Sequence, residues 1–151
     1  DENARVRAVA ATSLGRLGIR ENHPLLRALT RDASLQVRAS AVEGLLRLGD
    51  VSAVALAADL AKHPDPSIRA AAAHTLSATS DKQAVAILQT LLQDQQPQPR
   101  LAAVKALGKS GAPVTPLLKQ GLQDSDVAIR LAAAGSLLQQ LRRSTTPSKG
   151  R

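Results

Sequence analysis

The 151-residue sequence contains no Cys, Met, Phe, Trp or Tyr. The absence of cysteine excludes disulfide bonds, thiolate nucleophiles and cysteine metal sites. The absence of aromatic side chains removes the platforms on which nucleic-acid bases stack in many binding proteins. The hydrophobic core must therefore consist of Leu, Val, Ile and Ala, and the abundance of Ala and Leu favours helices over strands.

Long apolar runs are also missing. The longest nearly apolar stretch covers residues 51–58, contains Ser52 and is followed by Asp59, whereas a membrane-spanning helix needs about 20 residues. We therefore expect a soluble protein, with a cytoplasmic location favoured. The sequence has no initial methionine and no basic-then-apolar signal segment, and we interpret it as a fragment of a larger protein.

An internal repeat dominates the sequence. Its marker is an arginine that follows Val, Ile or Pro and precedes a regular pattern of Ala and Leu, and it occurs as Arg7, Arg38, Arg69, Arg100 and Arg130. Successive markers are 31, 31, 31 and 30 residues apart. A fixed period in this range is typical of a solenoid, in which each unit buries its apolar face against its neighbours.

The apolar residues within each unit recur at helical spacing and predict pairs of helices. Residues 1–17 match only the second helix of a unit, so their apolar face would lack the helix that normally precedes it; this face comprises Val6, Ala10, Leu14 and Leu17. The last predicted helix, 124–141, has its apolar face at Ile129, Ala133, Ala134, Leu137 and Leu141. We predict an all-α fold, a right-handed α-solenoid of about nine helices over residues 1–143, followed by a disordered basic tail at 144–151.

The five copies follow, to different degrees, the pattern D-x4-[VI]-R-x2-A-[AV]-x2-L-[GL]-x-L-G. This pattern resembles the HEAT repeat, most closely the short bacterial HEAT-like variety of phycobilisome lyase-like proteins, and the resemblance covers residues 1–141. In the part of the pattern up to the arginine, two copies depart from it. The third has His63 where the others have an aspartate, with Asp65 two residues later, and the fourth has Pro99 before its arginine.

The resemblance implies a structural role for the repeat arginines. Each would reach the turn aspartate of its own or the neighbouring unit, and the resulting ladder would consist of Asp1, Arg7, Asp32, Arg38, Asp65, Arg69, Asp94, Arg100, Asp124 and Arg130. A binding row for phosphates or carboxylates is the alternative. A single exposed ion pair contributes only about 0–1 kcal/mol. We therefore expect the stack to depend on leucine burial, at about 1.5–3 kcal/mol per fully buried side chain.

The resemblance also places the second helix of each unit on a concave surface. The residues opposite the predicted buried face would line that surface, and those predicted to bind a partner are Arg5, Arg16, Arg47, His74, Lys105 and Lys109. The surface is rich in small residues, polar and mildly basic. It suits an acidic or helical segment of a partner protein, or a neighbouring domain of the parent chain; a merely solvated face is the alternative.

The net charge of +8 raises a second possibility, a non-specific nucleic-acid binder. Four of the cations lie in the last ten residues, so about half of the excess charge belongs to the tail. No base-reading motif accompanies this charge. A third possibility is an accessory subunit of a lyase-like enzyme, and the oligomeric state stays open.

Catalytic and metal-binding patterns are not recognisable. The histidines at 23, 63 and 74 fall in different units with no paired metal-ligand spacing. The di-iron hydroxylase of the HEAT-like family ligates its metal through His-Glu dipeptides, and this sequence has none. It also lacks a G-x-S-x-G nucleophile motif and a phosphate-binding loop. We expect a scaffold without catalytic activity, metal or cofactor.

Overall fold

The computed structural model describes residues 2–145, with the backbone alone for 143–145. Within this range the chain forms nine α-helices and two short 3-10 helices. In chain order they are α1 (Ala4–Leu17), η1 (Arg20–Asn22), α2 (His23–Leu29), α3 (Leu35–Arg47), η2 (Val51–Ala53), α4 (Val54–Leu60), α5 (Pro66–Leu76), α6 (Lys82–Leu91), α7 (Pro97–Lys109), α8 (Thr115–Gly121) and α9 (Val127–Thr145).

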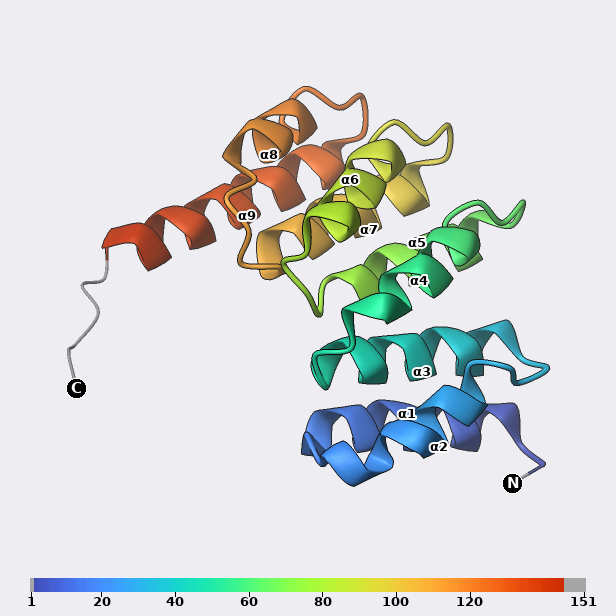
Figure 1. Cartoon of the computed structure of the whole chain (residues 1–151). Coiled ribbons are helices and arrows are strands. Elements are labelled where there is room, and N and C mark those ends of the chain that lie inside the picture. The colour runs from blue at the N-terminus through green and yellow to red at the C-terminus, as the bar shows by residue number, and fades with distance from the viewer. Residues whose placement is uncertain (1, 146–151) are drawn as a thin grey trace.

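The helices form two layers (Figure 1). The odd-numbered helices α1, α3, α5, α7 and α9 pack one on the next and form the first layer, which we call the odd layer. The even-numbered helices α2, α4, α6 and α8 pack on the odd helices from one side and form the second. Each unit thus contacts its sequence neighbours, and the predicted α-solenoid is confirmed.

Local sequence signals set where the helices begin and end. The side chains of Asn3, Asp65 and Asp81 accept hydrogen bonds from backbone N–H groups in the first turns of α1, α5 and α6, which satisfies donors that a helix leaves unpaired. Pro97 lies in the first turn of α7, where a missing N–H costs nothing. Helix α1 ends at Gly18, whose φ of 68° lies in the left-handed region that glycine adopts without a steric penalty.

The core follows the predicted repeat positions. Leu45, Leu76 and Leu107 are equivalent in successive units, and each is fully buried between the two layers. The odd helices approach closely through small residues. Where α1 packs on α3, Gly15 faces Gly44, and a Cβ added to Gly15 would collide with the Gly44 backbone.

The two ends of the array expose apolar residues. Val6 and Leu17 of α1 are 48% and 64% exposed, because no even helix precedes α1 within the described residues to cover this face. At the other end, the prediction that Leu141 lies on the buried face is wrong, since its side chain is 60% exposed. Figure 1 shows the reason: the C-terminal part of α9 projects past the rest of the stack.

Two sequence predictions concern the chain ends. Helix α9 continues through Thr145 and so includes the first two residues of the segment expected to form a tail. Residues 146–151 and Asp1, the first predicted ladder residue, lie outside the described residues. No described helix is both long and apolar enough to cross a bilayer.

Candidate partner-binding groove

A shallow groove of about 280 Å³ runs between α5 and α7. Its lining comes from α5, from Ser77 directly after it and from α7, with no residue of α4 or α6: Ala70, His74, Ser77, Gln98, Leu101, Ala102, Lys105, Ala106 and Lys109. The floor is apolar, and Lys105 and Lys109 stand one helical turn apart on one wall. We call it the α5/α7 groove. Because no carboxylate is among the described residues that line it, we regard the groove as a cationic site.

A charge cluster adjoins the groove and joins α3 to α5. The side chain of Glu43 is only 7% exposed. It accepts hydrogen bonds from Arg47 Nε and Nη2 at 3.0 and 2.7 Å, and its other carboxylate oxygen lies 3.4 Å from His74 Nδ1. Burial raises the pKa of Glu43, but hydrogen bonds from His74 and Arg47 outweigh it, so the pKa lies below its ordinary value.

The six residues predicted to bind a partner therefore fall into three groups. His74, Lys105 and Lys109 line the α5/α7 groove. Arg47 lies beside them but is bound to Glu43. Arg5 and Arg16 lie apart from both on exposed surface of α1. Glu43 was not among the residues predicted to bind a partner, and its i,i+4 spacing to Arg47 was the available signal for its role.

Three of the repeat arginines bridge successive units in the same way. Arg7, Arg69 and Arg100 each donate from Nε and Nη2 to both oxygens of the next unit's aspartate, over distances of 2.6–3.0 Å. The acceptors are Asp32, Asp94 and Asp124. The Nη1 of Arg69 also donates to two carbonyl oxygens in its own turn, at 2.9 and 2.8 Å. Each bridge thus fastens the turn of one unit to the turn of the next.

These bridges also stabilise the charged form of the aspartates. Hydrogen bonding from Arg7 lowers the pKa of Asp32 to about 2. Arg69 and Arg100 are the leading causes that hold the pKa of Asp94 and Asp124 below the ordinary range. Each aspartate also accepts a backbone N–H two residues along, as in the 2.8 Å bond from Ser34 N to Asp32, and so shapes its turn.

Some of the residues predicted to form the ladder do not bridge two units in the structure. Asp65 accepts from Ser67 N at 2.8 Å and caps α5, and no described arginine forms an ion pair with it. Arg38 would need a carboxylate at position 63, where His63 stands instead. Arg130, in the last helix described, donates to the carbonyl oxygens of Asp124 and Ser125 at 2.8 and 2.9 Å. The ladder predicted at Asp65, Arg38 and Arg130 is thus corrected, because none of the three forms an ion pair with another side chain in the described part of the chain.

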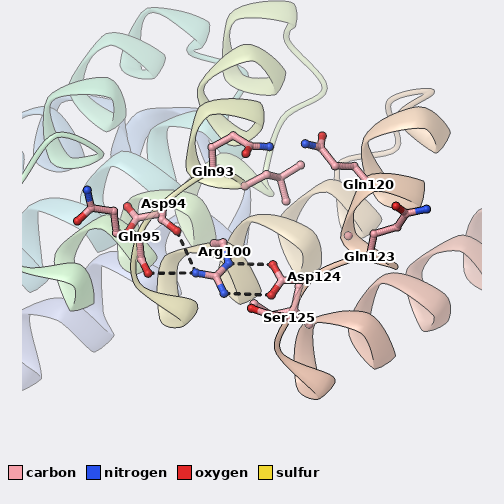
Figure 2. Close-up of a pocket in the computed structure, with 11 residues that line it drawn as sticks. Gln93, Asp94, Gln95, Arg100, Gln120, Gln123, Asp124 and Ser125 are labelled. Atoms are coloured by element: carbon pink, nitrogen blue, oxygen red, sulfur yellow. Dashed lines mark hydrogen bonds and ion pairs between the residues drawn. The ribbon is translucent and has the colours of Figure 1, made fainter.

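A larger hollow of about 380 Å³ surrounds the Arg100 bridge. Figure 2 shows the Arg100 guanidinium directed at Asp124 and at the turn that contains Asp94 and Gln95. The charged side chains of this hollow are already paired, Arg100 with Asp124 and Asp94 with Arg69 of the preceding unit. We therefore interpret it as a structural junction between units.

The three histidines stay apart. His23 Nε2 lies 2.7 Å from Asp50, His63 Nδ1 accepts from the backbone N–H of Asp65 at 3.1 Å, and His74 faces Glu43. Within residues 2–145 no group of three or more acidic or histidine side chains could hold a metal ion.

Comparisons with known proteins agree with this architecture. The family model for HEAT repeats matches residues 1–61, 22–100 and 55–139. Among solved structures, a chain of the complex of CpcE and CpcF of phycocyanin lyase from Nostoc sp. PCC7120 is 27% identical, with a TM-score of 0.65 over 94% of this chain and 62% of that chain. Human deoxyhypusine hydroxylase shares the fold, at 14% identity and a TM-score of 0.54 over 94% of this chain and 81% of that one.

The chain spans less than two thirds of the length of the matching chain of the lyase complex. No curated protein sequence matches the chain. The family match itself extends over nearly all the helices described above. The chain belongs to the HEAT repeat proteins.

Proposed function

We propose that this HEAT repeat array is a non-catalytic scaffold that binds an acidic segment of another protein, or of its parent chain, in the α5/α7 groove. The observation that carries the proposal is the pairing of an apolar floor with Lys105, Lys109 and His74 on one open face. An acidic segment with interspersed apolar side chains complements both features.

The dimensions of the groove suit a peptide. From Gln98 to Lys109, α7 rises about 16 Å at 1.5 Å per residue, which equals the length of about five residues in an extended strand. Its volume of about 280 Å³ falls at or below the lower end of the range for small-molecule pockets, about 300–1,000 Å³. Side chains from a docked segment would fill it, whereas a drug-sized molecule would stay largely exposed.

The adjoining cluster supports the same proposal. Glu43 binds both Arg47 of α3 and His74 of α5, and His74 is a lining residue of the groove, so Arg47 is held beside the groove. A partner carboxylate could bind the exposed side of Arg47, which is 38% exposed, without first ordering that side chain. Such preorganisation reduces the entropy lost on binding.

A role as the accessory subunit of an enzyme is the second candidate. The 27% identity to a chain of the phycocyanin lyase complex favours it, and that relative is itself described as part of a complex of two proteins. Both candidates require a protein partner. They differ in whether the bound partner acquires enzymatic activity, which a lyase assay with the partner would test.

The direct test uses a fluorescein-labelled twelve-residue peptide of alternating Glu and Leu, with binding followed by anisotropy at 150 mM NaCl. The groove variant K105E/K109E should weaken binding at least about tenfold. The control variant K82E/K119E makes the same change of charge on α6 and α8 of the even layer and should weaken it less than about threefold. Equal losses in both variants would show that net charge drives binding and would contradict the groove.

A single-stranded oligonucleotide and a tail deletion separate this proposal from polyanion binding. A polyanion binder that uses its basic end should lose most of its affinity when residues 144–151 are removed. A groove binder should keep its peptide affinity after the same deletion. Oligonucleotide binding that survives 200 mM salt and depends on sequence would reverse the ranking of the two functions.

A further inference from the structure

The ladder of bridges between units is interrupted at Arg38. Arg38 Nε is buried, and it has no hydrogen-bond partner among the described residues. The equivalent nitrogens of Arg7, Arg69 and Arg100 each bind a carboxylate at 2.6–2.8 Å. A buried guanidinium nitrogen without an acceptor is unfavourable, and this unit lacks the carboxylate that the equivalent arginines bind.

The substitution responsible is the histidine in the third unit. His63 Nδ1 accepts the backbone N–H of Asp65, which is the turn-shaping role that aspartates 32, 94 and 124 perform in other units. A neutral imidazole whose Nδ1 accepts carries its proton on Nε2. His63 therefore preserves the turn and offers a donor where the other units offer an acceptor.

A cavity of about 270 Å³ lies at this interruption. Arg38, His63 and Thr30 contribute polar groups to its lining, while Leu35, Leu56 and Leu60 contribute apolar ones. Asp59 is also a lining residue, and it is the one carboxylate among them. It is exposed and forms no ion pair with Arg38 in the part of the chain that the structure describes.

We propose that this cavity, which we call the Arg38 notch, binds a carboxylate on a short apolar stem. The carboxylate would accept from the two terminal nitrogens of the Arg38 guanidinium, because Nε itself is covered by protein atoms, and the stem would contact the leucines of the lining. Forked pairing of a guanidinium with a carboxylate is strong and directional. Two sources share this chemistry, a glutamate side chain of a partner protein and a free carboxylic acid of about four carbons.

The neighbouring units supply matched variants for the test. H63D places an aspartate where the other bridges have one, so it should pair with Arg38, raise the urea midpoint and weaken carboxylate binding. D94H makes the reverse change at an intact bridge and should create a second notch at Arg69. R38Q removes the fork and leaves the cavity.

Binding is measured by titrating sodium butyrate against sodium chloride of equal ionic strength. The readouts are amide NMR shifts around the notch and the melting temperature. The wild type should respond to butyrate more than to chloride, and R38Q and H63D should each lower the apparent affinity at least tenfold. The K105E/K109E variant should respond like the wild type, so failure of the α5/α7 groove and failure of the notch are distinguishable.

Peptides identify the source. A short peptide with one central Glu flanked by Ala is compared with the same peptide containing Gln. Binding of butyrate alone indicates a free acid, and binding of the Glu peptide indicates a partner side chain; either outcome supports the notch. The proposal is overturned if neither probe acts beyond chloride, or if R38Q responds as the wild type does. It is also overturned if D59N lowers the urea midpoint as much as D94N, because Arg38 would then already be paired with Asp59.

Discussion

Replacing Gly15 with alanine should destabilise the array, although alanine is the better helix former. Gly15 lies in α1 where that helix crosses α3, and a Cβ there would overlap Gly44 Cα and lie 3.3 Å from the Gly44 carbonyl carbon and oxygen. The obstacle is backbone, which cannot turn aside as a side chain can. Helix α1 would have to move away from α3, which weakens the packing that both share.

The matched control is Gly135→Ala in α9. Gly135 has no heavy atom within 4 Å of the position that a Cβ would occupy, so alanine brings only its helix propensity, worth about 1 kcal/mol. At Gly15 the same gain of about 1 kcal/mol is set against an overpacking cost of about 1–3 kcal/mol. The free energies of unfolding of the two variants should therefore differ by about 1–3 kcal/mol, with G135A the more stable.

The assay is urea or thermal unfolding followed by circular dichroism at 222 nm, because the chain has no Trp or Tyr to report by fluorescence. For a domain of this size 1 kcal/mol corresponds to about 2–4 °C in the melting temperature. G135A should melt above the wild type and G15A at or below it. If both variants melt above the wild type by the same margin, α1 and α3 do not approach as closely as the backbone geometry requires.

Three further changes test the energetics of the stack. Leu45→Ala removes a fully buried side chain and should cost about 2–5 kcal/mol in urea unfolding, with Arg38→Ala costing less; the reverse order would refute the dominance of leucine burial. Acid should weaken the array, because the pKa of Asp32 is about 2 in the folded protein and 3.8 ordinarily. The contribution of Asp32 to the free energy of unfolding is therefore complete above about pH 4 and declines as the pH falls toward 2. The D32N variant should lose stability less steeply over this pH range. Glu43→Gln should cost about 1–3 kcal/mol, because it weakens charge-assisted hydrogen bonds to a buried side chain; unchanged stability would show that the Glu43 cluster does not join α3 to α5.

The two-layer architecture could be predicted because the pattern that encodes it is local and repeated. Ala41 and Leu45 recur one period later as Ala72 and Leu76, and all four are fully buried. Each unit has the same neighbours, so one correct assignment extends to the next unit. The sequence also predicted that the apolar face of the first helix would be uncovered, because no helix precedes it in the sequence. The side chain of Val6 on that face is about half exposed.

The candidate groove was harder to predict, because it depends on how closely two helices approach. A helical pattern assigns Glu43 to the face opposite Ala41 and Leu45, and that face was expected to form an open concave surface. The small residues of α3 instead bring its neighbours close, and α5 covers Glu43 with His74. The distance between two helices depends on how the layers assemble, so the residue pattern within a single helix cannot predict it.

Arg38 shows how a repeat protein can be read more closely from its sequence. The structure pairs each bridging arginine with the aspartate 24 or 25 residues later, in the following unit. An arginine and the aspartate of its own turn are therefore not the informative pair. Counting 25 residues from Arg38 arrives at His63, so the sequence alone contains the interruption once the partner is sought in the next unit. A departure from the repeat pattern in one unit thus changes the chemistry available to an arginine in the preceding one, and variants of such arrays are best designed as pairs that span a junction.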